Sequence, residues 1–197
     1  MKFSPAQLVL IFANLAYIIP FSAYYIWIGQ GEFLWYVAVL VFFFSLILAT
    51  IHKSHFTPGI LWGLSLWGLG HMAGGGVKVG EGVLYSLPIV RIAEVGNTYI
   101  LKYDQVIHAF GFFVATLVVW HLLQPYLNEK ARLAVVLPIV WVAGMGLGAL
   151  NEVIEFLVVL TVPDNGVGGY FNTALDMVFN MLGALLAVVM IAVRRER

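Results

Sequence analysis

Six long apolar stretches constrain this chain more than any other feature of its sequence. About 20 mostly apolar residues suffice for a helix to cross the hydrocarbon core of a bilayer. Open β-strands are excluded there, because lipid offers no partner for unpaired backbone groups. The sequence therefore predicts an all-α fold, a polytopic membrane bundle of about six transmembrane helices in a single domain, residues 1–197. These helices are expected at about 7–29, 33–51, 58–74, 104–124, 133–161 and 171–193.

Composition supports a membrane protein. Charged residues make up 10% of the 197 residues, whereas soluble domains carry about 25%. The uncharged stretch from Phe3 to Gly31 is longer than the roughly 7–15 apolar residues of a cleaved signal peptide, so we expect a retained helix. Short connections join the predicted helices, except for one long loop at residues 75–103.

The basic residues predict how the chain is oriented. With an even number of helices both termini share one side, and that side carries seven of the ten lysines and arginines. The other three are Lys78, Arg91 and Lys102, in the loop 75–103. Because cytoplasmic segments are enriched in Lys and Arg, we expect both termini in the cytoplasm. The protein would then be integral to the inner membrane of the cell, with the loop 75–103 facing the outside or the periplasm.

Polar residues from four predicted helices converge at one depth in this membrane. With a rise of 1.5 Å per residue, all of them lie within roughly 15 Å of the outer boundary. A charge at the centre of a transmembrane helix costs roughly 2.5–3.5 kcal/mol, so such a group of residues indicates a site. The residues are His71, Asp104, His108, Glu152, Glu155, Asp176 and Asn180.

These residue types are typical of a metal site in a helical bundle. Spacings of three and four residues place each pair on one helix face, and carboxylates and histidines on facing helices bind one or two divalent metals. Oxygen and imidazole ligands favour Zn, Mn or Fe. Without a metal, clustered carboxylates cannot all be ionised in a medium of low dielectric constant. The predicted metal ligands are His71, Asp104, His108, Glu152 and Asp176.

Catalytic roles follow for the remaining polar groups. Glu155 would act as general base on a metal-bound water, and Asn180 or Lys102 would position the substrate. The metal would polarise an ester or phosphoester. The absence of cysteine excludes Fe–S clusters and thiolate ligands. We expect no haem. We also expect no nucleotide, since the segment 71–76 lacks the Gly-Lys-Ser/Thr ending of a phosphate-binding loop.

Structural alternatives remain open for these residues. Asp104 could cap the helix that begins near it, and His108 could be a packing histidine. Glu152 and Glu155 could pair with Lys102 or Arg91 in an ion-pair network, and Asn180 could be an interhelical hydrogen-bond donor. The whole group could also bind protons or a substrate without any metal.

Three functions compete on this basis. The first is a metal-dependent enzyme, hydrolytic or oxidative, that acts on a lipid or lipid-linked substrate beneath the loop 75–103 as a lid. The second is a divalent-metal or proton-coupled transporter, which is disfavoured because Leu133–Leu150 carries no charge and no repeat is evident. The third is a membrane interaction subunit with a structural polar core. The zero net charge gives no basic field for nucleic acid, and the oligomeric state is not predicted.

Four short motifs carry a resemblance to a known family. They are Gly70–His71, Tyr103–His108, Glu152–Phe156, and Asn172–Met177 followed by Gly183. In this order they resemble the YjdF-type family of bacterial inner-membrane proteins, over roughly residues 60–185. Asn172 stands where the family usually has Asp, and Gln105 where it tends to have Arg. The order is also similar, more loosely, to the VanZ-like membrane proteins, which implies a link to the cell envelope. Neither resemblance implies a particular reaction.

Overall fold

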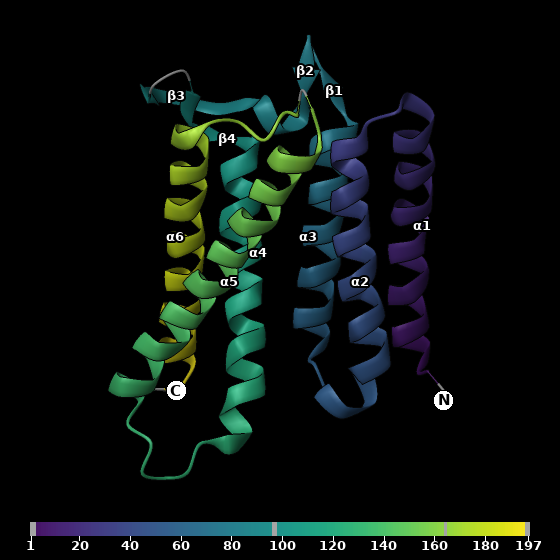
Figure 1. The fold of residues 1–197 in the computed structure, drawn as a ribbon. Coiled ribbons are helices and arrows are strands. Elements are labelled where there is room, and N and C mark those ends of the chain that lie inside the picture. Colours follow the sequence, from purple (N-terminus) through teal and green to yellow (C-terminus); the bar gives the residue numbers. More distant parts are fainter. Residues whose placement is uncertain (1–2, 96–97, 164, 196–197) are drawn as a thin grey trace.

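Six α-helices form the body of the protein, which is described here by a computed structural model covering residues 3–95, 98–163 and 165–195 (Figure 1). Each predicted apolar stretch coincides with one of these helices, which confirms an all-α membrane bundle. The helices are α1 (Pro5–Ile28), α2 (Gly31–Ser54), α3 (Pro58–Gly76), α4 (Tyr103–Leu123), α5 (Leu133–Thr161) and α6 (Tyr170–Arg195).

The helix ends follow local sequence rules. Ser4 precedes α1, where its hydroxyl accepts a hydrogen bond from the Gln7 amide at 3.2 Å and the Gln7 side chain accepts one from the Ser4 amide at 2.9 Å. The helix ends at Gly29, whose φ of 71° is left-handed and suits glycine. At α3 the Thr57 hydroxyl accepts a hydrogen bond from the Ile60 amide at 3.4 Å, and Pro58 follows at the first helical position.

Five of the six helices are long and apolar enough to cross a membrane by length and composition: α1, α2, α4, α5 and α6. The exception is α3, which contains several glycines together with Ser65 and His71. It packs against both α1 and α4, so its neighbours shield part of its surface from lipid and it needs less hydropathy of its own.

The connection between α3 and α4 is more regular than a loop. It contains two antiparallel hairpins, β1 (Lys78–Val79) with β2 (Gly82–Val83) and β3 (Pro88–Val95) with β4 (Thr98–Lys102), with a 3₁₀ turn at Leu84–Ser86 between them. Both hairpins lie at one end of the bundle, opposite the start of α1 and the end of α6 (Figure 1). Strand edges are tolerable there if that end lies outside the hydrocarbon core, where water can pair with them.

The helices form two groups of three. In one group α3 packs against α1 and α2; in the other α4, α5 and α6 pack against one another, and α3 meets α4 between the groups (Figure 1). Close backbone approach stabilises the second group. A Cβ atom added at Gly183 of α6 would lie 2.0 Å from the carbonyl oxygen of Ala109 on α4. Only glycine fits at this crossing.

Candidate functional site

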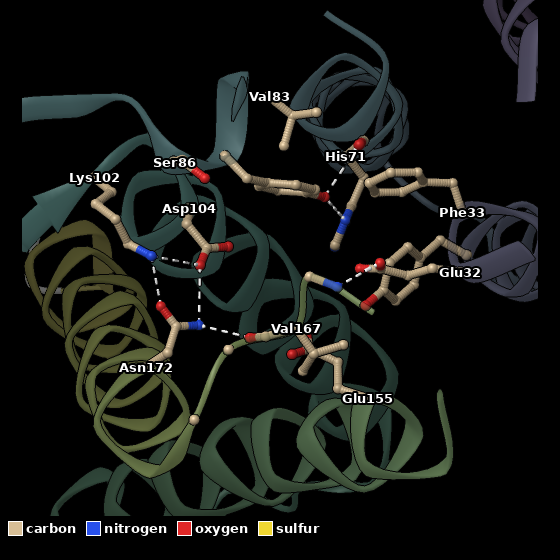
Figure 2. Close-up of a pocket in the computed structure, with 15 residues that line it drawn as sticks. Glu32, Phe33, His71, Val83, Ser86, Lys102, Asp104, Glu155, Val167 and Asn172 are labelled. Carbon is tan, nitrogen blue, oxygen red and sulfur yellow. Dashed lines mark hydrogen bonds and ion pairs between the residues drawn. The ribbon is translucent and has the colours of Figure 1, made fainter. Parts of the chain in front are cut away.

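A polar pocket of about 250 Å³ opens at the hairpin end of the bundle. Its lining comes from helices α2, α3, α4 and α5, from the first residues of α6 and the segment before it, and from the strands and the 3₁₀ turn of the hairpin region. Asp104 and Lys102 lie on one side of it, and His71 and Glu32 lie on the other (Figure 2). Among the residues expected at the site, His71, Lys102, Asp104 and Glu155 line this pocket.

His108 stands at the centre of the polar cluster beneath the pocket. It is 3% exposed. Its Nδ1 lies 2.9 Å from the side-chain oxygen of Asn180, so Nδ1–H donates to that oxygen. The other ring nitrogen, Nε2, lies 3.6 Å from Asp104 Oδ1 and 3.8 Å from Glu155 Oε1. The ring therefore offers Nε2 to the carboxylates that line the pocket.

Two carboxylates of α5 flank this histidine. The Asn180 amide nitrogen donates to Glu152 Oε1 at 3.2 Å, and that oxygen lies 3.6 Å from His108 Nδ1. Glu152 Oε2 is buried and has no hydrogen-bond partner within the part of the chain described. Glu155 accepts a hydrogen bond from Asn151 at 2.9 Å. An unpaired buried carboxylate oxygen is costly, so Glu152 Oε2 calls for a cation or a proton.

Asp176 is held from two sides. It is 0% exposed. Gln105 of α4 donates to its Oδ1 at 2.9 Å and Asn172 donates to its Oδ2 at 2.7 Å. Two amide side chains, one from α4 and one from α6, thus contact the same buried carboxylate.

Lys102 lies beside Asp104 at the edge of the pocket (Figure 2). Its Nζ donates to Asn172 Oδ1 at 2.5 Å and lies 3.6 Å from Asp104 Oδ2. Lys102 also occupies the N-cap position of α4, one residue before the helix begins. Asp104 is thus inside the first turn, and capping does not explain its place. The side chain of Arg91, the other basic partner considered for the carboxylates, lies outside the described residues.

His71 lies across the pocket from this cluster. Its Nδ1 contacts the hydroxyl of Tyr85, which also donates to the His71 carbonyl oxygen at 3.1 Å. Tyr85 comes from the 3₁₀ turn between the hairpins, and burial raises the pKa of its phenol well above the ordinary value. It therefore stays protonated and able to donate well into the alkaline range.

The carboxylates and His108 form two groups with spacing suitable for a metal ion. One consists of Asp104, His108 and Asp176, and the other of His108, Glu152 and Glu155; in each, ligand atoms lie within 4.8 Å of one another. His108 is common to both. His71 belongs to neither of these two groups, so it lies apart from the other predicted ligands.

The charges in this cluster do not balance. The contacts connect four carboxylates, those of Asp104, Glu152, Glu155 and Asp176, with Lys102 and His108 as positive partners. Even with His108 protonated, two negative charges remain among these groups. In a buried setting they must be compensated by protons or by a cation. A divalent ion bound by neutral His108 would leave one of the four carboxylates to be neutralised by a proton.

Sequence reasoning missed several residues of this site. Glu32 lines the pocket from the first turn of α2, where a carboxylate looks like an ordinary helix-end charge. Tyr85 lay in a segment expected to be a loop. Gln105, by contrast, could have been found, because it is a polar residue one position from Asp104 within an apolar helix.

Fold and site together define a polytopic helical membrane protein with a buried histidine–carboxylate cluster beneath a polar pocket. The chain belongs to the family described as predicted membrane protein (DUF2238), whose family model matches residues 5–197. No curated protein and no solved structure matches it.

Proposed function

We propose that this protein is a metal-dependent membrane enzyme, hydrolytic or oxidative, whose substrate is a lipid or a lipid-linked molecule. The observation that carries the proposal is the environment of His108, which four carboxylates from three helices surround with an excess of negative charge. Glu152, whose Oε2 has no hydrogen-bond partner among the described residues, belongs to the second ligand group around the same His108. The narrower resemblance to YjdF-type proteins is consistent with the family match.

The distances in the cluster suit a small divalent ion. Ligand atoms bind zinc at about 2.0–2.2 Å, so two ligands of one ion lie roughly 3–4 Å apart. His108 Nε2 and Asp104 Oδ1 are 3.6 Å apart. We assign Asp104, His108 and Asp176 as the primary ligands. Asn180 then acts as the orienting partner that fixes the ring of His108, as outer hydrogen bonds do at known metal sites.

Glu155 fits the role of general base. It lines the pocket, its Oε1 lies 3.8 Å from His108 Nε2, and Asn151 holds it from within the same helix. A metal held there, Zn, Mn or Fe, would supply Lewis-acid chemistry. Glu155 would accept the proton of the attacking water, and Lys102 would orient an anionic group of the substrate beside Asn172.

The location of the pocket supports a lipid substrate. It opens at the hairpin end, next to helix faces that expose large apolar side chains such as Trp35 and Phe156. A lipid in the bilayer could therefore reach the site with its polar group while its chains stay in the membrane. In the inner membrane, the orientation expected from the basic residues puts this end on the periplasmic or outer side, with both termini cytoplasmic.

Transport through the bundle is less well supported. Beyond the cluster, α4, α5 and α6 are packed together by an apolar core that includes Trp120, Leu137, Val140 and Ile191. Val140 is 0% exposed. An ion leaving the cluster in this direction would cross a dry apolar layer, which is costly for a charge.

The test is the metal content of the purified protein. Wild-type protein should carry at least one equivalent of Zn, Mn or Fe, and His108→Ala should lose it, because His108 belongs to both ligand groups. His121→Ala is the matched control, since His121 lies at the other end of α4 and contacts the Ser54 carbonyl oxygen. Wild-type protein that stays free of metal after exposure to all three ions would overturn the proposal.

A second measurement separates an enzyme from an interaction subunit. Glu155→Gln should keep its thermal stability and its metal. Its rate of conversion of the lipids in a membrane extract should fall by at least about a hundredfold, as expected for loss of a general base. A structural ion-pair core predicts the reverse: the variant would lose stability, and wild-type protein would show no turnover to lose.

A further inference from the structure

The pocket has a second polar end, away from the metal cluster. Glu32 of α2 lies there with Phe33 and Tyr36 from the same helix and Tyr85 from the 3₁₀ turn. The Glu32 carboxylate accepts a hydrogen bond from the Gly166 amide at 2.7 Å through Oε2. This end of the pocket is therefore acidic and aromatic.

The opposite end of the pocket carries a lysine beside a carboxylate. There Lys102 Nζ and the Asn172 side chain lie next to Asp104, across the pocket from Glu32 (Figure 2). A lysine with an amide partner binds phosphate oxygens. The metal assigned to Asp104 and its partners would add positive charge at this same end.

We propose that the pocket recognises a zwitterionic lipid headgroup, with its phosphate at the Lys102 end and its ammonium group at the Glu32 end. This inference rests on the proposed function, because it names the class of substrate for that site. The chemistry is that of a phosphoethanolamine headgroup, in which one phosphate and one ammonium are joined by a short linker.

Aromatic faces and a carboxylate are the groups that recognise an ammonium ion. A cation within about 6 Å of an aromatic ring is attracted to its face, more strongly where water is excluded. Phe33 and Tyr36 line the pocket next to Glu32 and pack against each other, with ring centroids 5.9 Å apart, so an ammonium group beside Glu32 would lie next to this aromatic pair. Glu32 supplies the opposite charge beside them.

The size of the pocket also matches a headgroup better than a whole lipid. Its volume of about 250 Å³ is below the roughly 300–1,000 Å³ of pockets that enclose a complete drug-sized ligand. The acyl chains would then remain in the bilayer, against exposed apolar residues of the neighbouring helices.

A purely structural role for Glu32 is the competing explanation. A carboxylate in the first turn of a helix interacts favourably with the helix dipole, and Glu32 also ties α2 to the segment before α6 through Gly166. The variant Glu32→Gln keeps an oxygen for the Gly166 amide and removes only the negative charge. It therefore separates charge recognition from tethering.

The experiment compares two short-chain lipids with the same acyl groups, phosphatidylethanolamine and phosphatidylglycerol, binding to the purified protein in detergent. Wild-type protein should bind the ethanolamine lipid roughly tenfold more tightly. Glu32→Gln should bring the two affinities to within about twofold of each other, mainly by weakening the binding of the ethanolamine lipid. Glu129→Gln, in an exposed loop, is the matched control and should keep the wild-type preference.

Other results would overturn the inference. They are a wild-type preference for phosphatidylglycerol, equal affinities in wild-type protein, or an equal weakening of both lipids by Glu32→Gln. Metal content measured on the same samples keeps the two proposals apart. Metal-free protein that still shows a Glu32-dependent lipid preference would refute the metalloenzyme and support the headgroup site. Protein that binds metal but shows no lipid preference would support the metalloenzyme and refute the headgroup site.

Discussion

The side-chain oxygen of Asn180 lies 2.9 Å from Nδ1 of His108, and this contact determines which ring nitrogen points toward the pocket. Because Nδ1 donates a hydrogen bond to Asn180 on α6, Nε2 is the nitrogen that faces Asp104 and Glu155. The same Asn180 donates to Glu152 through its amide nitrogen. One buried amide thus fixes a histidine and a carboxylate from two other helices.

Replacing Asn180 by Ala should therefore weaken metal binding without removing a ligand. Outer hydrogen-bond partners of metal ligands contribute about 10–100-fold in affinity, and we expect a loss in that range. Leaving buried partners unsatisfied should also lower the free energy of unfolding by about 1–3 kcal/mol. Metal titration of Asn180→Ala against Asn128→Ala, which changes an amide in the loop between α4 and α5, measures both effects. Unchanged affinity would refute the orienting role.

The two ligand groups can be separated by neutral variants of nearly the same shape. If the primary ion lies with Asp104 and His108, Asp176→Asn should abolish its binding, and Glu152→Gln should weaken it less. The number of metal equivalents bound per chain by each variant is the measurement. The assignment is wrong if Asp176→Asn retains all its metal while Glu152→Gln loses it.

Tyr85→Phe should impair activity with little effect on stability. The change removes the hydroxyl that contacts His71 Nδ1 and donates to the His71 carbonyl oxygen, so the imidazole loses its orientation in the pocket wall. We expect a drop of roughly 10-fold in turnover, with metal content unchanged, since positioning contacts contribute on this scale. Tyr126→Phe, at an exposed residue, is the control.

The effect of Tyr85→Phe should not depend on pH over a wide range. Burial raises the pKa of the Tyr85 phenol, so the hydroxyl stays protonated up to its ordinary pKa and beyond. The ratio of wild-type to variant turnover should therefore stay constant from neutral pH to about pH 10.

Gly183→Ala should destabilise the bundle. Its Cβ would lie 2.0 Å from the Ala109 carbonyl oxygen, so α4 and α6 would have to move apart. Overpacking of this kind costs typically 1–3 kcal/mol. Gly146→Ala on α5 is the matched control, because a Cβ there meets nothing within 4 Å. Thermal unfolding in detergent compares the two, and equal midpoints would contradict the close approach.

Liposomes that contain the protein should show no uptake of divalent ions above that of empty liposomes. The apolar packing around Val140 predicts this result, since it separates the cluster from the far end of the bundle. Uptake that depends on Glu152 at any pH between 5 and 8 would favour a transporter over an enzyme.

Much of the architecture could be predicted from the sequence because long apolar runs are governed by the membrane itself. Counting residues along each helix placed Glu152, Glu155 and Asp176 at one level, and the structure does bring them together around His108. Helical spacing also indicated that Asp104 and His108 share a face, which their 3.6 Å approach confirms.

The rest of the site depends on which helix faces meet, and spacing along one helix does not contain that information. His71 has the right depth, yet it lies on the far wall of the pocket because α3 packs against α1 and α4 rather than between α5 and α6. Tyr85 reaches it from a turn whose position depends on two hairpins. Glu32 lines the pocket together with Gly166, its hydrogen-bond partner, which is more than a hundred residues away along the chain.

The arrangement in two groups of three helices has a consequence for how such a protein can diversify. All four carboxylates of the cluster belong to α4, α5 and α6, whereas Glu32, Phe33 and Tyr36 belong to α2. Substitutions in the first half of the chain can therefore change which molecule is accepted while the reacting groups stay intact. Relatives that keep the second half and vary Glu32–Tyr36 should form a series with one chemistry and different substrates.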